Sequence, residues 1–227
     1  MTPVSIRRAQ KAVTRVVEDN LVAIYVLQRD SSEVISARVA TQVGVTASTM
    51  TETLRKLTRD GYARVDQHKR IHLTDKGREV AQAILRRHLL MERLLTDVLG
   101  MNWVDTHREA HRLEHVISPE VERRLAVLLN HPSTCPHGNP FPGQEESLKH
   151  SLPLTLTSEG QEVVIDRIVE EAESDTRLLA FLETSGLKPG THIKIIEVAP
   201  SLGTMTLRLE NHDISVGMQT AKVIRVH

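Results

Sequence analysis

The sequence predicts an α+β fold: an N-terminal winged helix-turn-helix, a helical middle part and a small C-terminal β-barrel. Three observations support this. Two short helical segments meet at a turn around Gly44, which is helix-turn-helix organisation. Longer segments with apolar residues at helical spacing continue to about Asn130. After a loop rich in proline and glycine at 131–143, β-branched residues recur in short runs to the C-terminus.

The helix-turn-helix begins with a helix from about Ser5 to Arg29, predicted by its apolar spacing. A second, shorter helix precedes the glycine turn. A third follows it, capped by Thr46 or Ser48, and runs to about Arg59.

The start of the third helix is unusually rich in hydroxyl groups, which in a recognition helix contact phosphates and base edges of double-stranded DNA. Two short strands at 62–65 and 70–74 follow, and the basic tip between them predicts a hairpin wing. An ordinary solvated helix face is the alternative interpretation of the same polarity. The residues that we expect to contact DNA are Thr46, Ser48, Thr49, Thr51, Arg55, Lys56, Lys69 and Arg70.

The helical middle part is predicted to contain a long helix at 76–99 that ends at Gly100, then helices at 103–117 and 119–130. The last part is predicted to be mostly strands with one short helix. The strands are expected within 152–158, 161–169, 190–200, 204–216 and 222–227, and the helix at 175–184.

The charge is distributed unevenly along a chain whose formal net charge is zero. Residues 1–87 hold 16 lysines and arginines against nine acidic residues, whereas residues 88–227 hold 13 against 20. This distribution favours a polyanion-binding part joined to a cation-binding part over a chance division of solvated charge.

Two classes of protein are not expected. The single cysteine, Cys135, excludes an internal disulfide framework. The N-terminus lacks the apolar run of a secretory leader, and no stretch approaches the roughly 18 apolar residues that span a membrane. We therefore expect a soluble cytoplasmic protein without a membrane partner.

The stretch HREAHRLEH, residues 107–115, concentrates metal-ligand side chains on one helix. His111, Glu114 and His115 stand at positions i, i+3 and i+4, so they share a face and can bind one cation. His107 lies one turn earlier. A polar, solvated helix face is the alternative.

A second ligand pair lies on the preceding helix, where His88 and Glu92 are four residues apart. If the two helices are antiparallel across Gly100, this pair comes close to His107. The helical hairpin therefore predicts two candidate metal sites.

The same stretch contains H-x-x-E-H, a spacing that also occurs in metallopeptidases. A peptidase would need a third protein ligand, an open position for water and a substrate cleft. The motif is short and follows a winged helix, so we expect no enzyme and no small organic substrate. A metallopeptidase remains the alternative from another class.

Four stretches of the chain resemble the diphtheria-toxin-repressor family of metal-dependent transcriptional repressors. HRLEHVIS together with HGNPFPG is a specific pairing, and the likeness covers nearly the whole chain. The resemblance implies a homodimer on operator DNA that controls metal homeostasis. It implies a DNA-binding domain at 1–74, a dimerisation and metal-binding domain at 75–143 and an SH3-like (FeoA-like) domain at 144–227. The four stretches are ARVATQVGVTASTMTETLRKLTRDGYARV, RRHLLMERLLTDVLG, HREAHRLEHVISPEVERRL and HGNPFPG.

The resemblance implies two metal sites. Ile24-Tyr25, which recurs in the family, sets the register of the first helix and so points to Asp19. The C-terminal domain is expected to add a ligand to the second site. The primary site would comprise Asp19, His111, Glu114 and His115, and the ancillary site His88, Glu92 and His107, with Glu173 or Asp175 as a further ligand.

The ligand types indicate which cation is expected. Iron-type members carry methionine where Asp19 stands and cysteine where His111 stands, whereas manganese-type members usually have aspartate and glutamate. Oxygen and imidazole ligands without sulfur suit a harder cation, so we expect Mn²⁺ as corepressor. Fe²⁺ is the alternative, and Zn²⁺ or Co²⁺ can substitute in vitro. Val22 stands where short manganese members have a glutamate, which favours the separate ancillary site.

A cation held between Asp19 and the helical part would fix the angle of the DNA-binding part. In a two-fold dimer that angle sets the spacing of two recognition helices, so metal would shift the population toward a DNA-competent state. A winged-helix regulator with a vestigial metal site is a further alternative.

Overall fold

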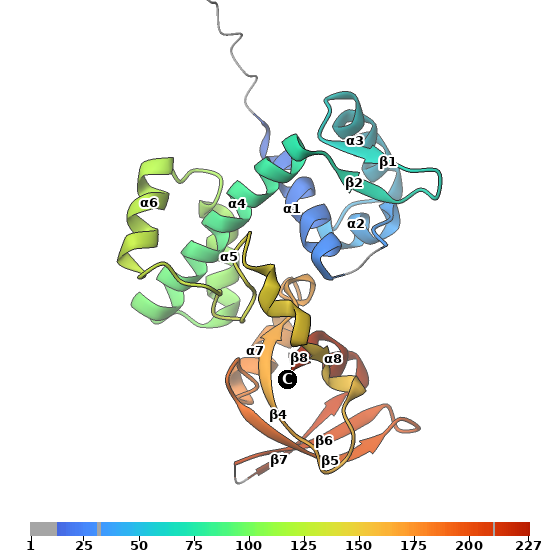
Figure 1. Cartoon of the computed structure of the whole chain (residues 1–227), viewed down its shortest axis with the longest axis vertical. Helices are drawn as coiled ribbons and strands as arrows, with labels where there is room; N and C mark the ends of the chain where they lie inside the picture. The colour runs from blue at the N-terminus through green and yellow to red at the C-terminus, as the bar shows by residue number, and fades with distance from the viewer. Residues whose placement is uncertain (1–12, 31–32, 211) are drawn as a thin grey trace, which may run out of the picture.

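The structure, a computed structural model, describes residues 13–30, 33–210 and 212–227. Figure 1 shows three bodies: the winged helix at the upper right, a helical part at the left and a sheet-containing part at the bottom. The predicted start of the first helix, residues 5–12, lies outside the described residues.

The helix-turn-helix is formed as the sequence predicts. Helix α1 (Arg15–Asp30) packs its apolar face into the core of this part, and α2 (Ser36–Val43) follows it. Gly44 ends α2 in the left-handed region at φ 70°, where a residue without Cβ avoids strain. Helix α3 (Ala47–Arg59) begins at Thr46, whose side chain accepts a hydrogen bond from a backbone N–H of the first turn.

The wing consists of β1 (Ala63–Val65) and β2 (Ile71–Leu73), which pair antiparallel. One carboxylate, Asp66, organises its tip. It accepts backbone hydrogen bonds from His68 at 2.8 Å and Arg70 at 2.9 Å, and it also pairs with the Arg70 guanidinium at 2.8 Å. Arg70 is therefore partly engaged within the wing itself.

The helical part contains α4 (Asp75–Arg93), α5 (Trp103–Leu113) and α6 (Pro119–Leu128). The predicted single helix at 76–99 is instead α4 followed by a π-helical turn, η1 (Leu94–Val98). Insertions of this kind widen the helix locally and occur often at functional sites. Gly100, at φ 68°, then reverses the chain so that α5 packs back against α4.

The C-terminal part is a six-stranded antiparallel sheet with the order β3-β8-β4-β5-β6-β7. It curves around its own apolar core, as expected for an SH3-like barrel. Its strands are β3 (Leu152–Pro153), β4 (Glu162–Ile168), β5 (His192–Ala199), β6 (Thr204–Leu209), β7 (His212–Gly217) and β8 (Ile224–Val226). Its helices are α7 (Thr176–Thr184) and α8 (Met218–Val223), with shorter turns η2 (Glu145–His150), η3 (Leu154–Leu156) and η4 (Glu170–Ala172).

Two details of this part differ from the sequence predictions. The strand predicted at 152–158 stops after Pro153 and continues as the 3-10 turn η3, because proline has no N–H to extend a ladder. Helix α8 was not predicted. It covers the start of the strand predicted at 222–227, so that β8 begins only at Ile224. The six residues of α8 are too few for a helical period to be recognised.

The three parts are joined by packed side chains. Trp103, the first residue of α5, is buried in the core of the barrel, and Cys135 and Phe141 of the 131–143 loop are buried in the core of the winged helix and α4. The three bodies in Figure 1 therefore share packed cores.

Buried ion pairs also connect the end of α1 to the barrel. Arg29 donates to Glu170 at 2.9 Å, and Arg167 on β4 pairs with Asp30. All four side chains are less than a tenth exposed, so removing one partner would leave an uncompensated buried charge. These contacts set the position of α1 beside the barrel.

The loop at 131–143 supplies a test of this packing. A Cβ on Gly138 would lie 2.2 Å from the Asp166 carbonyl oxygen, and φ there is +87°. Gly143 has a similar φ of +92° but faces open space. We expect Gly143→Ala to cost about 1 kcal/mol from backbone strain, and Gly138→Ala to cost about 1–3 kcal/mol more from the clash. Thermal unfolding of both variants checks this, and equal midpoints would contradict the close approach.

Candidate metal centre

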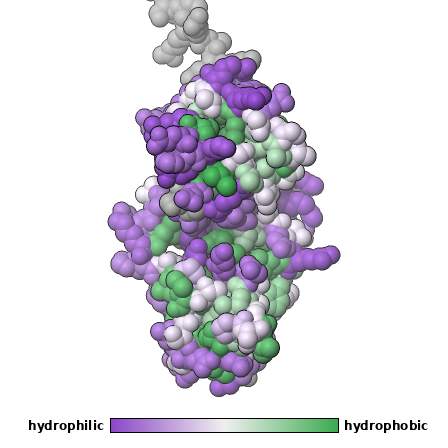
Figure 2. All heavy atoms as spheres, turned by 90° about the vertical axis from the view of Figure 1, so that its right-hand side faces the viewer, coloured by the Kyte–Doolittle hydropathy of each residue, from purple (hydrophilic) through white to green (hydrophobic). Residues whose placement is uncertain are grey.

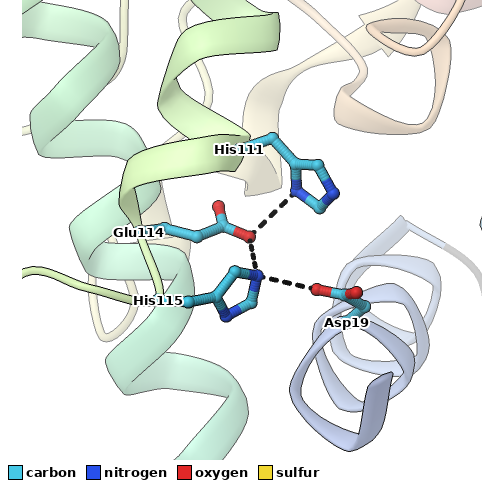
Figure 3. A group of neighbouring side chains, drawn as sticks. All are labelled: Asp19, His111, Glu114 and His115. Atoms are coloured by element: carbon cyan, nitrogen blue, oxygen red, sulfur yellow. Dashed lines mark hydrogen bonds and ion pairs between the residues drawn. The ribbon is translucent and has the colours of Figure 1, made fainter. Parts of the chain in front are cut away.

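The four residues expected at the primary site lie together between α1 and the end of α5 (Figure 3). His115 Nε2 is 2.9 Å from Asp19 Oδ1 and 3.0 Å from Glu114 Oε1. His111 Nδ1 is 3.0 Å from the same Glu114 oxygen. Asp19 comes from the DNA-binding part and the other three from the helical part, so the group spans the junction.

Local structure explains this arrangement. His111 lies in the last turn of α5, and Glu114 and His115 follow directly, so their spacing puts them on one side of the chain. Asp19 lies in the second turn of α1, which packs against α4. Glu114 and His115 are buried, whereas the His111 side chain is about half exposed at 49%. The group therefore opens to solvent at His111.

A second group lies deeper, between α4, α5 and the barrel. Glu92 Oε1 is 3.1 Å from His88 Nε2 and 3.2 Å from His107 Nδ1, and Glu173 Oε2 is 3.4 Å from that same His107 nitrogen. These four residues form a candidate ligand group. The helical part and the barrel both contribute to it, and the winged helix does not.

Of the two carboxylates considered for the barrel, the structure brings only Glu173 to this group. Asp175 caps α7, where its Oδ1 accepts from the backbone N–H groups of Arg177 and Leu178 at 3.0 and 3.1 Å. An N-cap of this kind is a sufficient structural role.

Two residues that the sequence analysis left without a role also reach this group. His137 Nδ1 is 3.5 Å from Glu92 Oε2 and 3.3 Å from Glu173 Oε1, and with Cys135 and Glu92 it forms a third candidate group. Both come from the 131–143 loop and are fully buried. The signal in the sequence was the C-x-H spacing just inside a loop already noted for HGNPFPG.

His88 connects the two main groups. Its Nδ1 is 2.5 Å from Glu114 Oε2 in the first group, and its Nε2 contacts Glu92 in the second. The ring is buried, and both of its nitrogens are engaged. The carboxylate of one group is therefore oriented by a ring that belongs to the other.

The histidines and carboxylates determine one another's charge. Burial alone would lower the pKa of His88, but Glu92 and Glu114 raise it well above its usual value. Burial alone would raise the pKa of Glu114, but its histidine neighbours, His88 first, hold it well below the usual range. Without a cation, these shifts favour an ionised Glu114 beside a protonated His88.

The residues fit a divalent cation. Among the described side chains, several buried atoms of these candidate groups have no hydrogen-bond partner. Buried polar atoms are rarely left in this state unless an ion or water completes them. The donor set consists of carboxylate and imidazole, with one thiol nearby. The atoms without a hydrogen-bond partner are Asp19 Oδ1, His115 Nε2, Glu92 Oε2, Glu173 Oε2 and His137 Nε2.

The peptidase interpretation of H-x-x-E-H finds no support in this geometry. Glu114 contacts His88, His111 and His115, so imidazoles engage both of its carboxylate oxygens.

The residues expected to contact DNA lie on one side of the winged helix, around the start of α3 and the wing tip. Their side chains are exposed, except that Arg70 is partly covered by its pairing with Asp66. Thr46 also forms 2.9 Å hydrogen bonds to the hydroxyls of Ser48 and Thr49, which hold the helix start. Figure 2 views the molecule from the right-hand side of Figure 1, and its upper part shows hydrophilic areas beside smaller apolar patches.

A winged helix-turn-helix joined to a metal-ligand group defines a metal-responsive DNA-binding protein, and comparison with known proteins gives the family. The models for the iron-dependent repressor N-terminal DNA-binding domain, for its metal-binding and dimerisation domain and for the FeoA domain match residues 12–73, 74–143 and 152–227. The chain belongs to this iron-dependent repressor family, whose members are metal-dependent transcriptional repressors.

Curated relatives and solved structures extend along almost the whole chain. The iron-dependent repressor IdeR of Mycobacterium tuberculosis is 34% identical over 215 residues, 89% of this chain and 93% of the relative. The diphtheria toxin repressor of Corynebacterium diphtheriae is 32% identical over 212 residues, 89% and 92%. A manganese-dependent transcriptional repressor solved with manganese superposes with a TM-score of 0.82 at 28% identity, covering 92% and 98%. In the described part of the chain, no helix is long and apolar enough to cross a membrane.

Proton competition provides a test of the metal centre. Burial alone would lower the pKa of His107, but hydrogen bonds to Glu173 and Glu92 raise it to about 9. His107 is therefore protonated at neutral pH, and a cation must displace that proton to use the ring nitrogen. We expect Mn²⁺ affinity to increase as the pH rises toward about 9, with protons released on binding. Calorimetry in two buffers of different ionisation enthalpy measures this release. Affinity that is independent of pH would contradict ligation by these histidines.

Proposed function

We propose that this protein is a homodimeric, Mn²⁺-activated repressor in which Asp19, His111, Glu114 and His115 hold the activating cation. One observation carries the proposal. Asp19 Oδ1 on α1 faces His115 Nε2 at 2.9 Å, and both atoms lack a hydrogen-bond partner among the described residues. The cation, when bound, supplies the attraction between a carboxylate of the DNA-binding part and ligands of the helical part.

The consequence for DNA binding follows from where the ligands are attached. Asp19 lies on α1, whose buried residues share one core with the recognition helix α3 and with α4. We propose that α1 and α3 move together. His111, Glu114 and His115 move with the helical part. Holding the two sets together fixes the angle between them, and in a dimer this angle sets the spacing of two recognition helices. Metal thereby favours the conformation that fits operator DNA.

The second group supports an ancillary site. His88, Glu92, His107 and Glu173 would hold a cation that ties the barrel to the helical part. His137 lies on the other side of Glu92 and Glu173, with its Nε2 unpaired among the described residues. We propose that His137 and Cys135 extend this site or replace His107 in it.

The choice of Mn²⁺ rests on ligand chemistry. The primary group offers oxygen and imidazole without sulfur, which suits a hard or borderline cation. The relatives include both iron-dependent and manganese-dependent repressors. His111 is an imidazole where a carboxylate would suit Mn²⁺ better, so Fe²⁺ is the second candidate, and Zn²⁺ or Co²⁺ would occupy the site in vitro.

The helical part also presents a surface for the second subunit. Helix α6 has no buried residue, and its apolar Val121, Val127 and Leu128 are 46–66% exposed. Leu99, beyond the π-helical turn, is 62% exposed. Apolar side chains gathered on the matched dimerisation domain are expected to be covered by its partner. We propose a two-fold dimer through this surface, acting on DNA in the cytoplasm.

Asp19 gives the decisive variant. Asp19→Asn keeps the shape of the side chain but removes its charge, and we expect metal-dependent binding to an operator-containing DNA pool to weaken by more than about 100-fold, beyond the range typical of an outer-shell partner. Fluorescence anisotropy with chelator and then with metal measures the effect. The variant should remain a folded dimer by light scattering. Metal activation equal to that of the wild type would contradict the bridging role of Asp19.

The same assay on the wild type discriminates the alternatives. Binding that appears only with metal supports the repressor mechanism, and the order of activation by Mn²⁺, Fe²⁺ and Zn²⁺, at controlled redox potential and low free metal, decides between manganese and iron. Equal binding with chelator would indicate a constitutive regulator with a vestigial site. Peptide hydrolysis that Glu114→Gln abolishes would indicate the metallopeptidase.

The dimer surface has its own test. Leu128→Glu places a charge in the exposed apolar surface of α6, and we expect dissociation to monomers because an interface would have to bury that charge. Arg124→Glu on the same helix, 74% exposed, serves as a charged control. Sedimentation measures the oligomeric state. A dimer that persists in Leu128→Glu would show that this surface lies outside the interface.

A further inference from the structure

Glu18, immediately before the expected ligand Asp19, contacts the same histidine from the other side. Its Oε2 lies 2.7 Å from His115 Nδ1, while Asp19 Oδ1 lies 2.9 Å from His115 Nε2. Two successive residues of α1 therefore hold one imidazole at both of its ring nitrogens. The His115 side chain is 7% exposed and that of Glu18 18%, so solvent screens this contact little.

We propose that Glu18 is a positioning residue of the primary site: it fixes the tautomer and the ring orientation of His115. This inference rests on the proposed metal-binding function. A neutral imidazole has one N–H and one lone pair. If Nδ1–H donates to Glu18, the lone pair is at Nε2, the nitrogen that faces Asp19 and Glu114. Carboxylates placed in this way raise the basicity of a metal-bound histidine as well as orienting it.

The position of Glu18 in the chain gives the contact a second consequence. Glu18 belongs to the DNA-binding part and His115 to the helical part, 97 residues later. The hydrogen bond therefore crosses the same junction that the cation would close. The Nδ1 contact can persist when Nε2 is used for metal, whereas the direct Asp19–His115 contact cannot. The Glu18 contact is therefore compatible with a cation bound at Nε2.

A purely structural role makes the opposite prediction. If Glu18 served only to pair with a protonated His115, it would stabilise the metal-free state. Its removal would then leave metal affinity unchanged or increase it. The positioning role requires that removal of Glu18 weakens metal binding. The sign of the change therefore separates the two roles.

The experiment is a Mn²⁺ titration of the full-length protein, with free Mn²⁺ followed by electron paramagnetic resonance. The primary site is identified as the class of site that Asp19→Asn abolishes. We expect Glu18→Ala to lower its affinity about 10- to 100-fold. Glu18→Gln should fall between Ala and the wild type, because its amide oxygen still accepts from Nδ1–H. Glu79→Gln, at an exposed position of α4, is the matched control and should equal the wild type.

A spectroscopic signature completes the test. With Cd²⁺ as a diamagnetic probe, ¹⁵N-histidine spectra should show His115 protonated at Nδ1 and bound at Nε2 in the wild type, and this pattern should be lost in Glu18→Ala. Affinity in Glu18→Ala that equals or exceeds the wild-type value would overturn the inference. The proposed function would still stand in that case, because the wild type would bind Mn²⁺ and be activated by it. A wild type that lacks the Asp19-dependent site would instead overturn the proposed function.

Discussion

The contact between α1 and the segment that follows α5 is the constraint on which the arrangement of the molecule depends. His115 is its centre, with Glu18 on one ring nitrogen and Asp19 facing the other. Helix α1 shares a core with the recognition helix and with α4, so packed side chains connect this contact to the DNA-binding part. The far end of α1 is fixed separately, by the buried Arg29–Glu170 pair with the barrel. The helix is thus held at two points by two different parts of the protein.

The buried group between α4, α5 and the barrel must hold positive charge. Glu92 and Glu173 are fully buried within reach of the same two histidines, and like charges at such sites are strongly unfavourable in isolation. Protons on His107 and His137 can balance them, and so can a divalent cation. The two solutions exclude each other at each ring nitrogen, because a ligating imidazole must be neutral there. Proton binding and the proposed metal binding would therefore balance the charge of the same buried carboxylates.

Much of this could be predicted from the sequence, because it depends on local periodicity. The i, i+3, i+4 spacing within HREAHRLEH put three candidate ligands on one side, and the glycine between α4 and α5 predicted the approach of His107 to His88 and Glu92. Asp19 required the family resemblance, since no local pattern connects α1 to α5. Glu18, Cys135 and His137 have no periodic signal, and only the tertiary packing of α1 and of the 131–143 loop brings them to the ligands. The strand misassigned after Pro153 and the unpredicted α8 show the same limit, since short irregular segments follow packing more than period.

Because the candidate ligands come from separate parts of the protein, metal binding would change the angle between those parts. A site built within one domain would bind its cation without altering any angle between domains, however tightly it bound. Here the first group takes one residue from α1 and three from the helical part, and the second takes Glu173 from the barrel. On the proposed function, each group would be completed only when its parts approach, so the free energy of metal binding would differ between arrangements, as a population shift requires. His88 contacts both Glu114 and Glu92 and so connects the geometry of the two groups.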